Sequence, residues 1–445
     1  MICVHGLGYV GLATAALFAN AGHEVVGYDP SERVQRSLAE RRPRVTEPEL
    51  REFVCRALDG EGEGHLTVGE RPVAAEFHLV CVPTPYDEST GRADLQYVDS
   101  AARNVGEVLR EGDVVVLEST VPPGTTEGSF RETLESVSGL VAGTDFGLAF
   151  TPETVLPGNT VAELRSNARI VGGIDPGSRE AVRALYGTAI EAERLSAPDC
   201  ATAEFVKLAQ NASRDVEIAF ANEMARVAGD YGIDARVAIG LANHHPRVNI
   251  LSPGPGVGGH CLPVDPYFLR ERSDSVHLVE AARRVNDSMP DYVLELLAGA
   301  LGDLDGSTVA VVGVAYKGNV DDARNSPGLA IADRLGATLP EGIELHGRAI
   351  PLVSDGGGHA DGTVPDEGIS VRLTDPHVTD ESLGLVPLGD ALAGADAAVI
   401  GAPHAEYADL DPAWVADLGP RVVVDPFGLL VPERWAEAGV DVVTY

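Results

Sequence analysis

The sequence predicts an α/β protein in which two doubly wound domains are joined by a long central helix and a helical middle domain. Short β-branched runs alternate with helical stretches up to about residue 149, which predicts a parallel sheet with helices on both faces. Residues 199–228 then contain neither Gly nor Pro. A second alternation of strands and helices begins at Thr308 and continues to the end of the sequence.

The first domain is predicted to span residues 1–197. Its elements are inferred from β-branched runs and from apolar residues at helical spacing. The expected strands are residues 2–5, 24–28, 77–82, 114–118 and 147–151, and the expected helices include 11–21 and 95–109. A shorter unit at 169–195 completes the domain.

A helix over residues 199–231 is predicted to connect the domains, with a length of about 45 Å. Apolar residues at helical spacing predict an inward-facing stripe on it. They are Phe205, Leu208, Ala212, Val216, Ala219, Phe220 and Met224. This helix opens the middle domain, residues 198–300, which also holds a loop rich in Pro and Gly and further helix.

The C-terminal domain, residues 301–445, is predicted to be a second doubly wound sheet. Its expected strands are residues 308–313, 370–374, 397–400 and 421–425. Residues 335–370 have little helical pattern and contain the run Ser354 to Gly358, so we expect a mobile surface insertion there.

The acidic balance of the chain excludes several classes of partner. Its 445 residues include 68 acidic and 33 basic side chains, for a formal net charge of -35. Binding to nucleic acid or to an anionic membrane requires a basic surface. No apolar run is long enough to cross a bilayer, no signal peptide is evident, and the five cysteines show neither a disulfide framework nor a zinc spacing. We expect a cytoplasmic protein.

Lysine is almost absent. Only Lys207 and Lys317 occur, and every other basic residue apart from histidine is arginine. An acidic surface that uses arginine suits a halophilic protein in a high-salt cytoplasm, or a GC-rich genome. Because lysine is a compact cation that can lose its proton when desolvated, we expect these two residues at functional positions.

A dinucleotide fingerprint follows the first expected strand. The run Gly6 to Gly11 has the pattern GxGxxG and opens a helix, and Asp29 ends the next strand. The glycines permit a tight turn, close approach of a pyrophosphate and helix packing, while the acid favours NAD over NADP. The first domain is therefore expected to be Rossmann-like and to bind NAD. Gly313 to Lys317 lack this fingerprint, so the second domain is expected to hold something else.

The densest motif runs from Pro253 to Tyr267 and contains Cys261 among glycines. Little side-chain bulk surrounds this cysteine, so a substrate can approach it closely. His260 or a helix dipole could lower its pKa, and Asp265 could act as a base through water. The alternative is a glycine turn around a structural cysteine. His244 and His245 are adjacent and do not share a helix face, so no metal site is predicted.

These motifs resemble those of the nucleotide-sugar 6-dehydrogenases, over nearly the whole chain. The matching segments are residues 6–29, Val82 to Pro85, Glu118 to Thr125, Thr151 to Glu153, Glu204 to Asn211, the Cys261 loop, and Gly313 to Pro327. The resemblance implies oxidation of a sugar C6 alcohol to a carboxylate with reduction of two NAD molecules. In that reaction Cys261 would trap the aldehyde as a thiohemiacetal that becomes a thioester.

The resemblance also implies roles for individual residues. Glu153 would assist thioester hydrolysis, Lys207 and Asp265 would handle the first proton and the oxyanion, and Asn211 and Thr120 would lie around the reacting centre. The implied cofactor residues are Gly6, Gly8, Tyr9, Val10, Gly11, Asp29, Pro83, Thr84, Ser119 and Thr120. The implied substrate residues are Glu153, Lys207, Asn211, Arg247, Gly258, Lys317 and Arg324. Arg247 would reach the sugar site of a neighbouring subunit in a homodimer formed by helix packing.

Four local details favour a UDP-N-acetyl-D-mannosamine substrate and polysaccharide biosynthesis, with UDP-N-acetylglucosamine and UDP-glucose as alternatives. They are residues 156–159, 211–215, 253–256 and 265–269. Thr154 and the run Pro426 to Gly428 depart from the pattern, each where related sequences carry arginine. Two other classes remain: a two-electron hydroxyacid dehydrogenase, which needs no nucleophilic cysteine, and a non-enzymatic NAD sensor, which would not retain Cys261, Glu153, Lys207 and Asp265 together.

Overall fold

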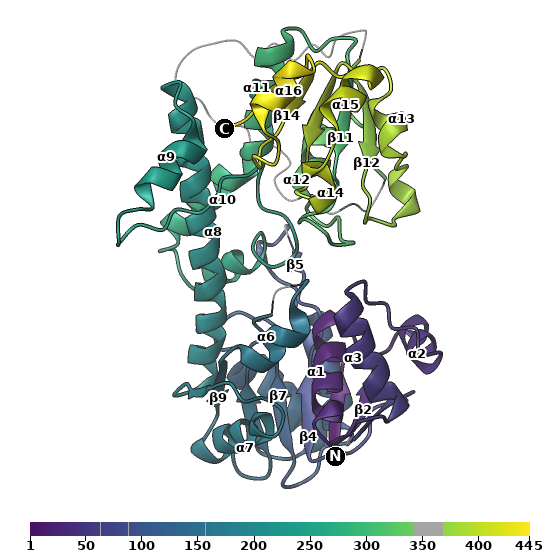
Figure 1. Ribbon diagram of the computed structural model, residues 1–445. Helices are drawn as coiled ribbons and strands as arrows, with labels where there is room; N and C mark the ends of the chain where they lie inside the picture. The colour runs from purple at the N-terminus through teal and green to yellow at the C-terminus, as the bar shows by residue number, and fades with distance from the viewer. Residues whose placement is uncertain (63, 88, 156, 341–342, 344, 346–367) are drawn as a thin grey trace. The chain divides into compact units, whose positions relative to one another are not determined.

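The computed structural model describes residues 1–445 except 63, 88, 156, 341–342, 344 and 346–367 (Figure 1). The chain forms two compact units. The first unit comprises Met1–Asn211 and Val264–Ser275, and the second comprises Ala212–Pro263 and Val276–Tyr445. The middle of the chain is thus shared between the units, and the three-domain division stays a prediction.

The first unit is built on an eight-stranded sheet. In sheet order its strands are β10 (Arg194–Ser196), β9 (Arg169–Gly173), β8 (Gly147–Phe150), β7 (Val114–Leu117), β4 (Phe77–Val80), β1 (Ile2–His5), β2 (Glu24–Tyr28) and β3 (His65–Gly69). All neighbours are parallel except β8 and β9, which pair antiparallel. Every residue of β1 and β7 is buried, as expected for strands covered on both faces.

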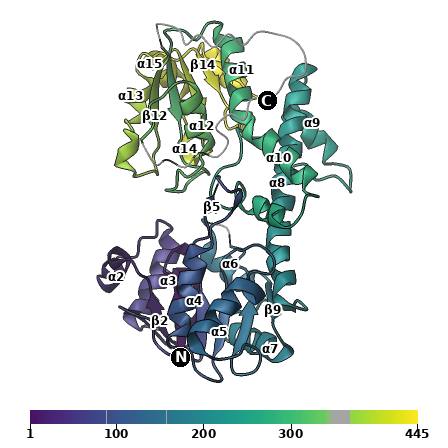
Figure 2. The ribbon, with the colours of Figure 1, turned by 180° about the vertical axis from the view of Figure 1, so that it is seen from behind.

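Helices cover both faces of this sheet. One face packs against α1 (Tyr9–Asn20), α3 (Pro48–Asp59), α6 (Thr160–Ser166) and α7 (Pro176–Gly187). The opposite face packs against α4 (Gln96–Gly106) and α5 (Arg131–Ser138), which come to the front when the molecule is turned (Figure 2). The unit also contains α2 (Glu32–Ala39), the π-helical turn η1 (Thr126–Phe130) and the 3-10 helix η2 (Asp265–Glu271). A small hairpin is formed by β5 (Tyr86–Asp87) and β6 (Arg92–Ala93).

The long helix α8 spans Cys200–Asp230, within one residue of the prediction at each end. Its predicted apolar stripe is partly wrong, because Phe205 and Phe220 are 52% and 48% exposed. The side chains that α8 buries include Glu204, Asp215 and Asn222 as well as Leu208 and small alanines. The inward face therefore combines small apolar residues with polar anchors.

The second unit contains a five-stranded parallel sheet. Its strands, in sheet order, are β12 (Ser370–Thr374), β11 (Thr308–Val312), β13 (Ala397–Ile400), β14 (Val422–Val424) and β15 (Asp441–Val443). One face packs against α11 (Met289–Leu301) and α12 (Pro327–Arg334). The other packs against α13 (Leu388–Leu392), α14 (Ala405–Ala408), α15 (Pro412–Leu418) and α16 (Pro432–Glu437). The unit also holds α9 (Ala235–Ala242) and α10 (His277–Asp287).

The predicted fold class is confirmed, but strands β3 and β15 were not among the expected strands, and α4 ends three residues before the expected end of its helix. Helix α1 begins at Tyr9, two residues before the expected start, so the fingerprint's last glycine lies inside the helix. Strands β4 and β7 end one or two residues early, because the chain turns there into loops. Most of the predicted insertion at 335–370 lies outside the described residues. Within the described residues, no helix combines the length and apolar character needed to cross a membrane.

A buried ion pair holds α8 to α10 in the second unit. Arg283 is 2% exposed and donates to Asp215 at 2.6 Å, and it also bonds Asp287. Asn286 donates to the same Asp215 carboxylate at 2.8 Å. Burial raises the pKa of Asp215, and Arg283 opposes that effect.

Replacing Arg283 with Leu is expected to lower the free energy of unfolding by about 3–5 kcal/mol, because Asp215 is left as an unpaired buried charge. Denaturant unfolding followed by circular dichroism at fixed salt measures this. The matched control is Arg214→Leu, which removes an exposed ion pair to Glu217 at 3.6 Å and should cost less than about 1 kcal/mol. Equal losses in the two variants would show that the buried pair contributes no more than a surface one.

Candidate active site

Two of the three fingerprint glycines between β1 and α1 have no room for a Cβ atom, and the third is open. Gly6 has a φ of +89°, and a Cβ there would lie 2.4 Å from the carbonyl oxygen of Cys81. A Cβ on Gly11 would lie 1.9 Å from the carbonyl oxygen of Gly6. Gly8 has nothing within 4 Å of the same position, and no side chain caps the helix that follows it. A phosphate group fits such an open helix N-terminus.

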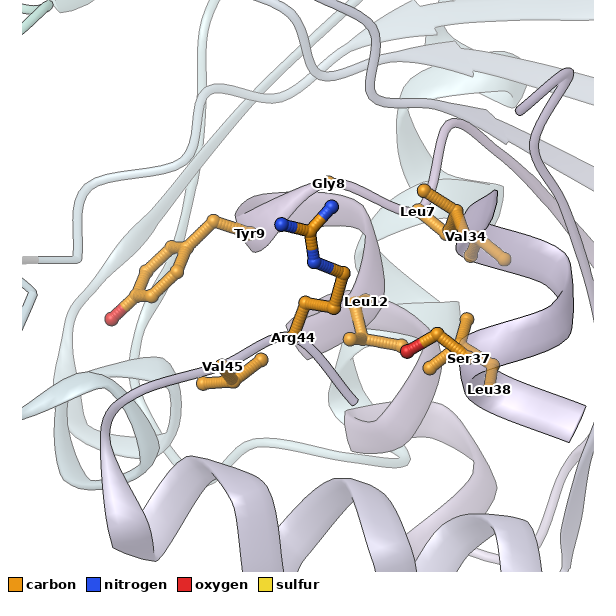
Figure 3. Close-up of a pocket in the computed structure, with 9 residues that line it drawn as sticks. All are labelled: Leu7, Gly8, Tyr9, Leu12, Val34, Ser37, Leu38, Arg44 and Val45. Atoms are coloured by element: carbon orange, nitrogen blue, oxygen red, sulfur yellow. The ribbon is translucent and has the colours of Figure 1, made fainter. Parts of the chain in front are cut away.

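Asp29 closes this turn from the end of β2. Its carboxylate accepts hydrogen bonds from the backbone N–H groups of Leu7 and Ser31, both at 2.9 Å. A cavity of about 260 Å³ lies beside the turn (Figure 3). It is lined by Leu7, Gly8, Tyr9, Leu12, Val34, Ser37, Leu38, Arg44 and Val45. Sequence reasoning missed Arg44, whose exposed guanidinium is a local cation beside a site for an anionic cofactor.

The loops after β4 and β7 lie next to each other because these strands are neighbours in the sheet. Ser119 accepts a hydrogen bond from the Val82 N–H at 2.8 Å, and Thr84 donates to the carbonyl oxygen of Thr120 at 2.7 Å. These bonds bring together the two segments that contain the predicted cofactor residues Pro83, Thr84, Ser119 and Thr120.

Helix α8 presents Lys207 and Asn211 one turn apart on one face. Asn211 donates to the Asp265 carboxylate at 2.5 Å, and the charge of Lys207 also acts on Asp265. Asp265 is 5% exposed. Burial raises its pKa to about 6, although Lys207 and Asn211 act in the opposite direction. The structure thus groups three of the predicted catalytic residues within the first unit.

Glu204 anchors the same helix to the loop that contains Thr120. Its buried carboxylate accepts from the Gly124 N–H at 2.5 Å and from the N–H and hydroxyl of Thr126 at 2.8 and 2.5 Å. Sequence analysis placed Glu204 in a matching segment but gave it no role. The sequence does not show that Glu204 is buried on its helix. A buried acid needs hydrogen-bond donors from its neighbours, so knowing its burial would have indicated an anchoring role.

Glu153 follows β8 and is 8% exposed. It contacts the buried Arg169, the first residue of β9, at 3.7 Å. Arg169 had no place in the sequence prediction, because a single arginine at the start of an apolar run carries no motif.

Cys261 belongs to the second unit, where its loop packs against residues 316–325. A Cβ on Gly258 would lie 2.6 Å from the carbonyl oxygen of Asn325, so only glycine fits there. Gly259 donates to the Arg324 carbonyl at 2.9 Å, and Asn325 donates to the Gly259 carbonyl at 2.8 Å. Cys261 itself is exposed, which contradicts a buried structural cysteine.

The other predicted substrate residues also lie in the second unit. Lys317 is half-buried in the loop after β11, and Arg324, from the segment that holds the Cys261 loop, pairs with Asp322 at 2.5 Å. Burial, with the nearby charges of Asp322 and Cys261, raises the pKa of Tyr316 to about 12. Arg247 is exposed in the loop after α9, and no contact described here ties it to these residues.

The turn after β11 in the second sheet resembles the turn after β1 in the first, but side chains of the protein fill it. Gly313 donates to Thr374, as Gly6 donates to Tyr28, and Asp375 accepts from the Val314 N–H at 2.7 Å. His404 then accepts from the Asn319 N–H and donates to Asp375, both at 2.9 Å. Although burial acts to raise it, the pKa of Asp375 is held well below its usual range by His404 and by the backbone N–H groups of His377 and Val378. Asp375 takes the position equivalent to Asp29, but its carboxylate is also bonded by a buried histidine side chain.

Comparison with known proteins identifies the family. Residues 1–190 match the NAD binding domain of the UDP-glucose/GDP-mannose dehydrogenase family, and residues 201–288 match its central domain. The chain belongs to this family. It is 37% identical to the UDP-N-acetyl-D-mannosamine dehydrogenase of Methanocaldococcus jannaschii, over 99% of this chain and 95% of that protein.

Other relatives belong to the same class of enzyme. An NDP-N-acetyl-D-galactosaminuronic acid dehydrogenase of Ralstonia solanacearum is 36% identical over 98% of this chain and 97% of its own length. The structure of a UDP-D-ManNAc dehydrogenase from Pyrococcus horikoshii matches with a TM-score of 0.87 and 34% identity, covering 100% of this chain and 99% of that one. The predicted resemblance is confirmed, and the protein is an NAD-dependent nucleotide-sugar dehydrogenase.

The raised pKa of Asp265 makes stability depend on pH. In the unfolded chain this carboxyl ionises at its ordinary value of 3.8, but in the folded protein it resists ionisation until about pH 6. The wild type should therefore lose stability relative to Asp265→Asn as pH rises from about 4 to about 7.

Thermal unfolding across this pH range measures the effect. The Tm of Asp265→Asn minus that of the wild type should increase with pH, whereas the exposed Asp274→Asn should show no such trend. A difference that is constant from pH 4 to 7 would show that Asp265 does not titrate in this way.

Proposed function

We propose that this enzyme oxidises C6 of UDP-N-acetyl-D-mannosamine to the carboxylate, with reduction of two NAD molecules. The observation that carries the proposal is the group of Lys207, Asn211 and the buried Asp265. Asp265 lies four residues after the exposed Cys261 in the sequence.

The residues around the first turn fit NAD. The open backbone at Gly8 and the uncapped N-terminus of α1 would hold its pyrophosphate, and Asp29 would accept from its ribose. NAD bound there supplies the hydride acceptor for both oxidations. Arg44 would offset part of the repulsion between an anionic cofactor and a chain of charge -35.

The first oxidation requires a base for the C6 hydroxyl proton. Lys207 stands beside Asp265 and can take this proton directly or through water, and as an ammonium it stabilises the developing alkoxide. Asn211 holds the Asp265 carboxylate, which keeps a counter-charge beside the lysine. The alcohol loses a hydride and a proton, and an aldehyde results.

The second oxidation passes through Cys261. Its thiolate adds to the aldehyde carbon, and the new C–S bond keeps the intermediate on the enzyme. Loss of a second hydride from that carbon, with the hydroxyl proton, converts the thiohemiacetal into a thioester. Water then attacks the thioester carbon, Glu153 accepts a proton from it, the C–S bond breaks, and the carboxylate leaves.

The sugar is assigned from relatives. Proteins at 34–39% identity include several named UDP-N-acetyl-D-mannosamine dehydrogenases. A relative at 36% carries the name of an N-acetylgalactosaminuronic acid enzyme, so the N-acetylhexosamine class has broader support than the individual epimer.

Purified enzyme incubated with NAD should produce two NADH per UDP-N-acetyl-D-mannosamine consumed. The same assay with UDP-N-acetylglucosamine, UDP-glucose and GDP-mannose should give kcat/KM values at least about tenfold lower. Cys261→Ser should reduce turnover by about 10²-fold or more, because the hydroxyl is a poorer nucleophile.

One NADH per sugar would exclude the thioester route and favour a simple two-electron dehydrogenase. A higher kcat/KM with UDP-glucose would support the four-electron oxidation but would show that UDP-glucose is the preferred substrate. Full activity of Cys261→Ser would remove this residue from the mechanism.

We further propose that the enzyme is a homodimer. Large apolar side chains are exposed at the end of α8 and along α9, where a second copy would cover them. They are Val227, Tyr231, Ile233, Val237 and Leu241, with exposed fractions of 40–77%. Arg247 lies in the loop that follows α9, within reach of such an interface.

Leu241→Asp should shift the protein from dimer to monomer in size-exclusion chromatography with light scattering, at constant high salt. Leu241 is 67% exposed, so the monomer should keep its fold. The matched control is Val431→Asp, which replaces a side chain 59% exposed outside α8 and α9. A monomeric wild type, or a dimeric Leu241→Asp, would rule out this interface.

A further inference from the structure

Arg169 places a full positive charge inside the first unit. It is the first residue of β9 and is 2% exposed. A buried guanidinium without counter-charges would cost far more than its hydrogen bonds return. The groups that surround the guanidinium therefore indicate the function of its charge.

Two acids and an aromatic ring surround this guanidinium. Its Nη1 donates to the carbonyl oxygen of Pro152 at 3.1 Å, and its Nη2 lies 3.7 Å from Oε1 of Glu153. The ring of Tyr186 lies beneath it, with its centroid 4.8 Å away. Tyr186 in turn donates to the second acid, Glu118.

The two acids differ in how they are satisfied. Glu118 also accepts from the Thr14 hydroxyl at 3.2 Å and the Cys81 thiol at 3.3 Å, so both of its oxygens have donors. Burial raises the pKa of Glu118, and the charge of Arg169 opposes this. Glu118, the residue after β7, thus joins α1, α7 and the residue after β4, and both of its oxygens are occupied.

Glu153 is held at one oxygen only. Its Oε1 accepts from the N–H groups of Thr154 and Val155 at 2.8 and 3.0 Å and faces Arg169. Its Oε2 is buried and has no hydrogen-bond partner among the described residues. A buried carboxylate oxygen without a donor is costly and calls for a function. Oε2 is the atom that remains able to take a proton.

We propose that Arg169 is the positioning residue that makes Glu153 a base for thioester hydrolysis. Two backbone amides bind Oε1, and the guanidinium lies 3.7 Å from the same oxygen, so the orientation of the carboxylate is fixed. Oε2 then takes one proton from water as the water oxygen bonds to the thioester carbon. The C–S bond breaks, and Cys261 leaves as the thiolate. This inference rests on the proposed thioester mechanism.

The test separates hydrolysis from the two oxidations. Arg169→Gln removes the positive charge, whereas Arg169→Lys keeps the charge but not the planar guanidinium. The control is Arg165→Gln, which replaces an exposed arginine on α6. Each variant is mixed rapidly with NAD and UDP-N-acetyl-D-mannosamine. NADH absorbance gives the burst and the steady state, and intact mass spectrometry detects sugar bound to Cys261.

Arg169→Gln should keep a burst of two NADH per site, while its steady-state rate falls by about tenfold or more and the covalent adduct accumulates. Arg169→Lys should fall between this variant and the wild type, and Arg165→Gln should match the wild type. Hydroxylamine attacks a thioester without help from a base, so it should restore NADH turnover in Arg169→Gln. A merely structural defect would not respond to hydroxylamine.

Several outcomes would overturn the inference. Arg169 does not act on hydrolysis if the burst amplitude and the steady-state rate of Arg169→Gln fall together. The same conclusion follows if no covalent adduct is detected or if hydroxylamine does not restore turnover. If Arg169→Gln does not fold, the same comparison with Arg169→Lys decides. A wild type that forms one NADH and no adduct would reject the thioester mechanism itself, whatever the Arg169 variants do.

Discussion

The polar face of α8 is the constraint on which the rest of the structure depends. Glu204, Asp215 and Asn222 are fully buried on this helix, and a buried polar group must find partners. Each partner lies on another loop or helix. Glu204 holds the loop after β7, Asp215 holds α10 through Arg283, and Asn222 accepts from Gly254 in the segment that leads to Cys261.

This arrangement also explains how an acidic protein can handle an anionic substrate. The overall charge of -35 repels both nucleotides, so the compensation has to be local. Positive charge is supplied by single arginines and lysines in defined surroundings: Arg44 in the cavity, Arg169 beside Glu153, and Lys207 beside Asp265. Burial strengthens the interaction of Arg169 with Glu153, because the surrounding dielectric is low and salt screens the pair little.

Much of the fold could be predicted from the sequence because strands buried on both faces and a 31-residue helix leave strong periodic signals. Asp29 and the glycines were predictable as well, since each has a local mechanical reason. The orientation of α8 was not, because Phe205 and Phe220 fit a helical stripe as well as the residues that are actually buried. Arg169 and Glu204 were missed as functional residues for the same kind of reason. Their roles come from partners distant in the chain, as with Glu204 and Thr126.

The scarcity of lysine gives the molecule an unusual chemical selectivity. Only two side-chain amines exist in the sequence, and one of them lies beside Asp265 on α8. A reagent that attacks primary amines would therefore modify very few positions, while the arginine-rich surface would stay untouched. Isotopic methylation of Lys207 and Lys317 would give two resolved reporters, one in each unit, without any engineered label.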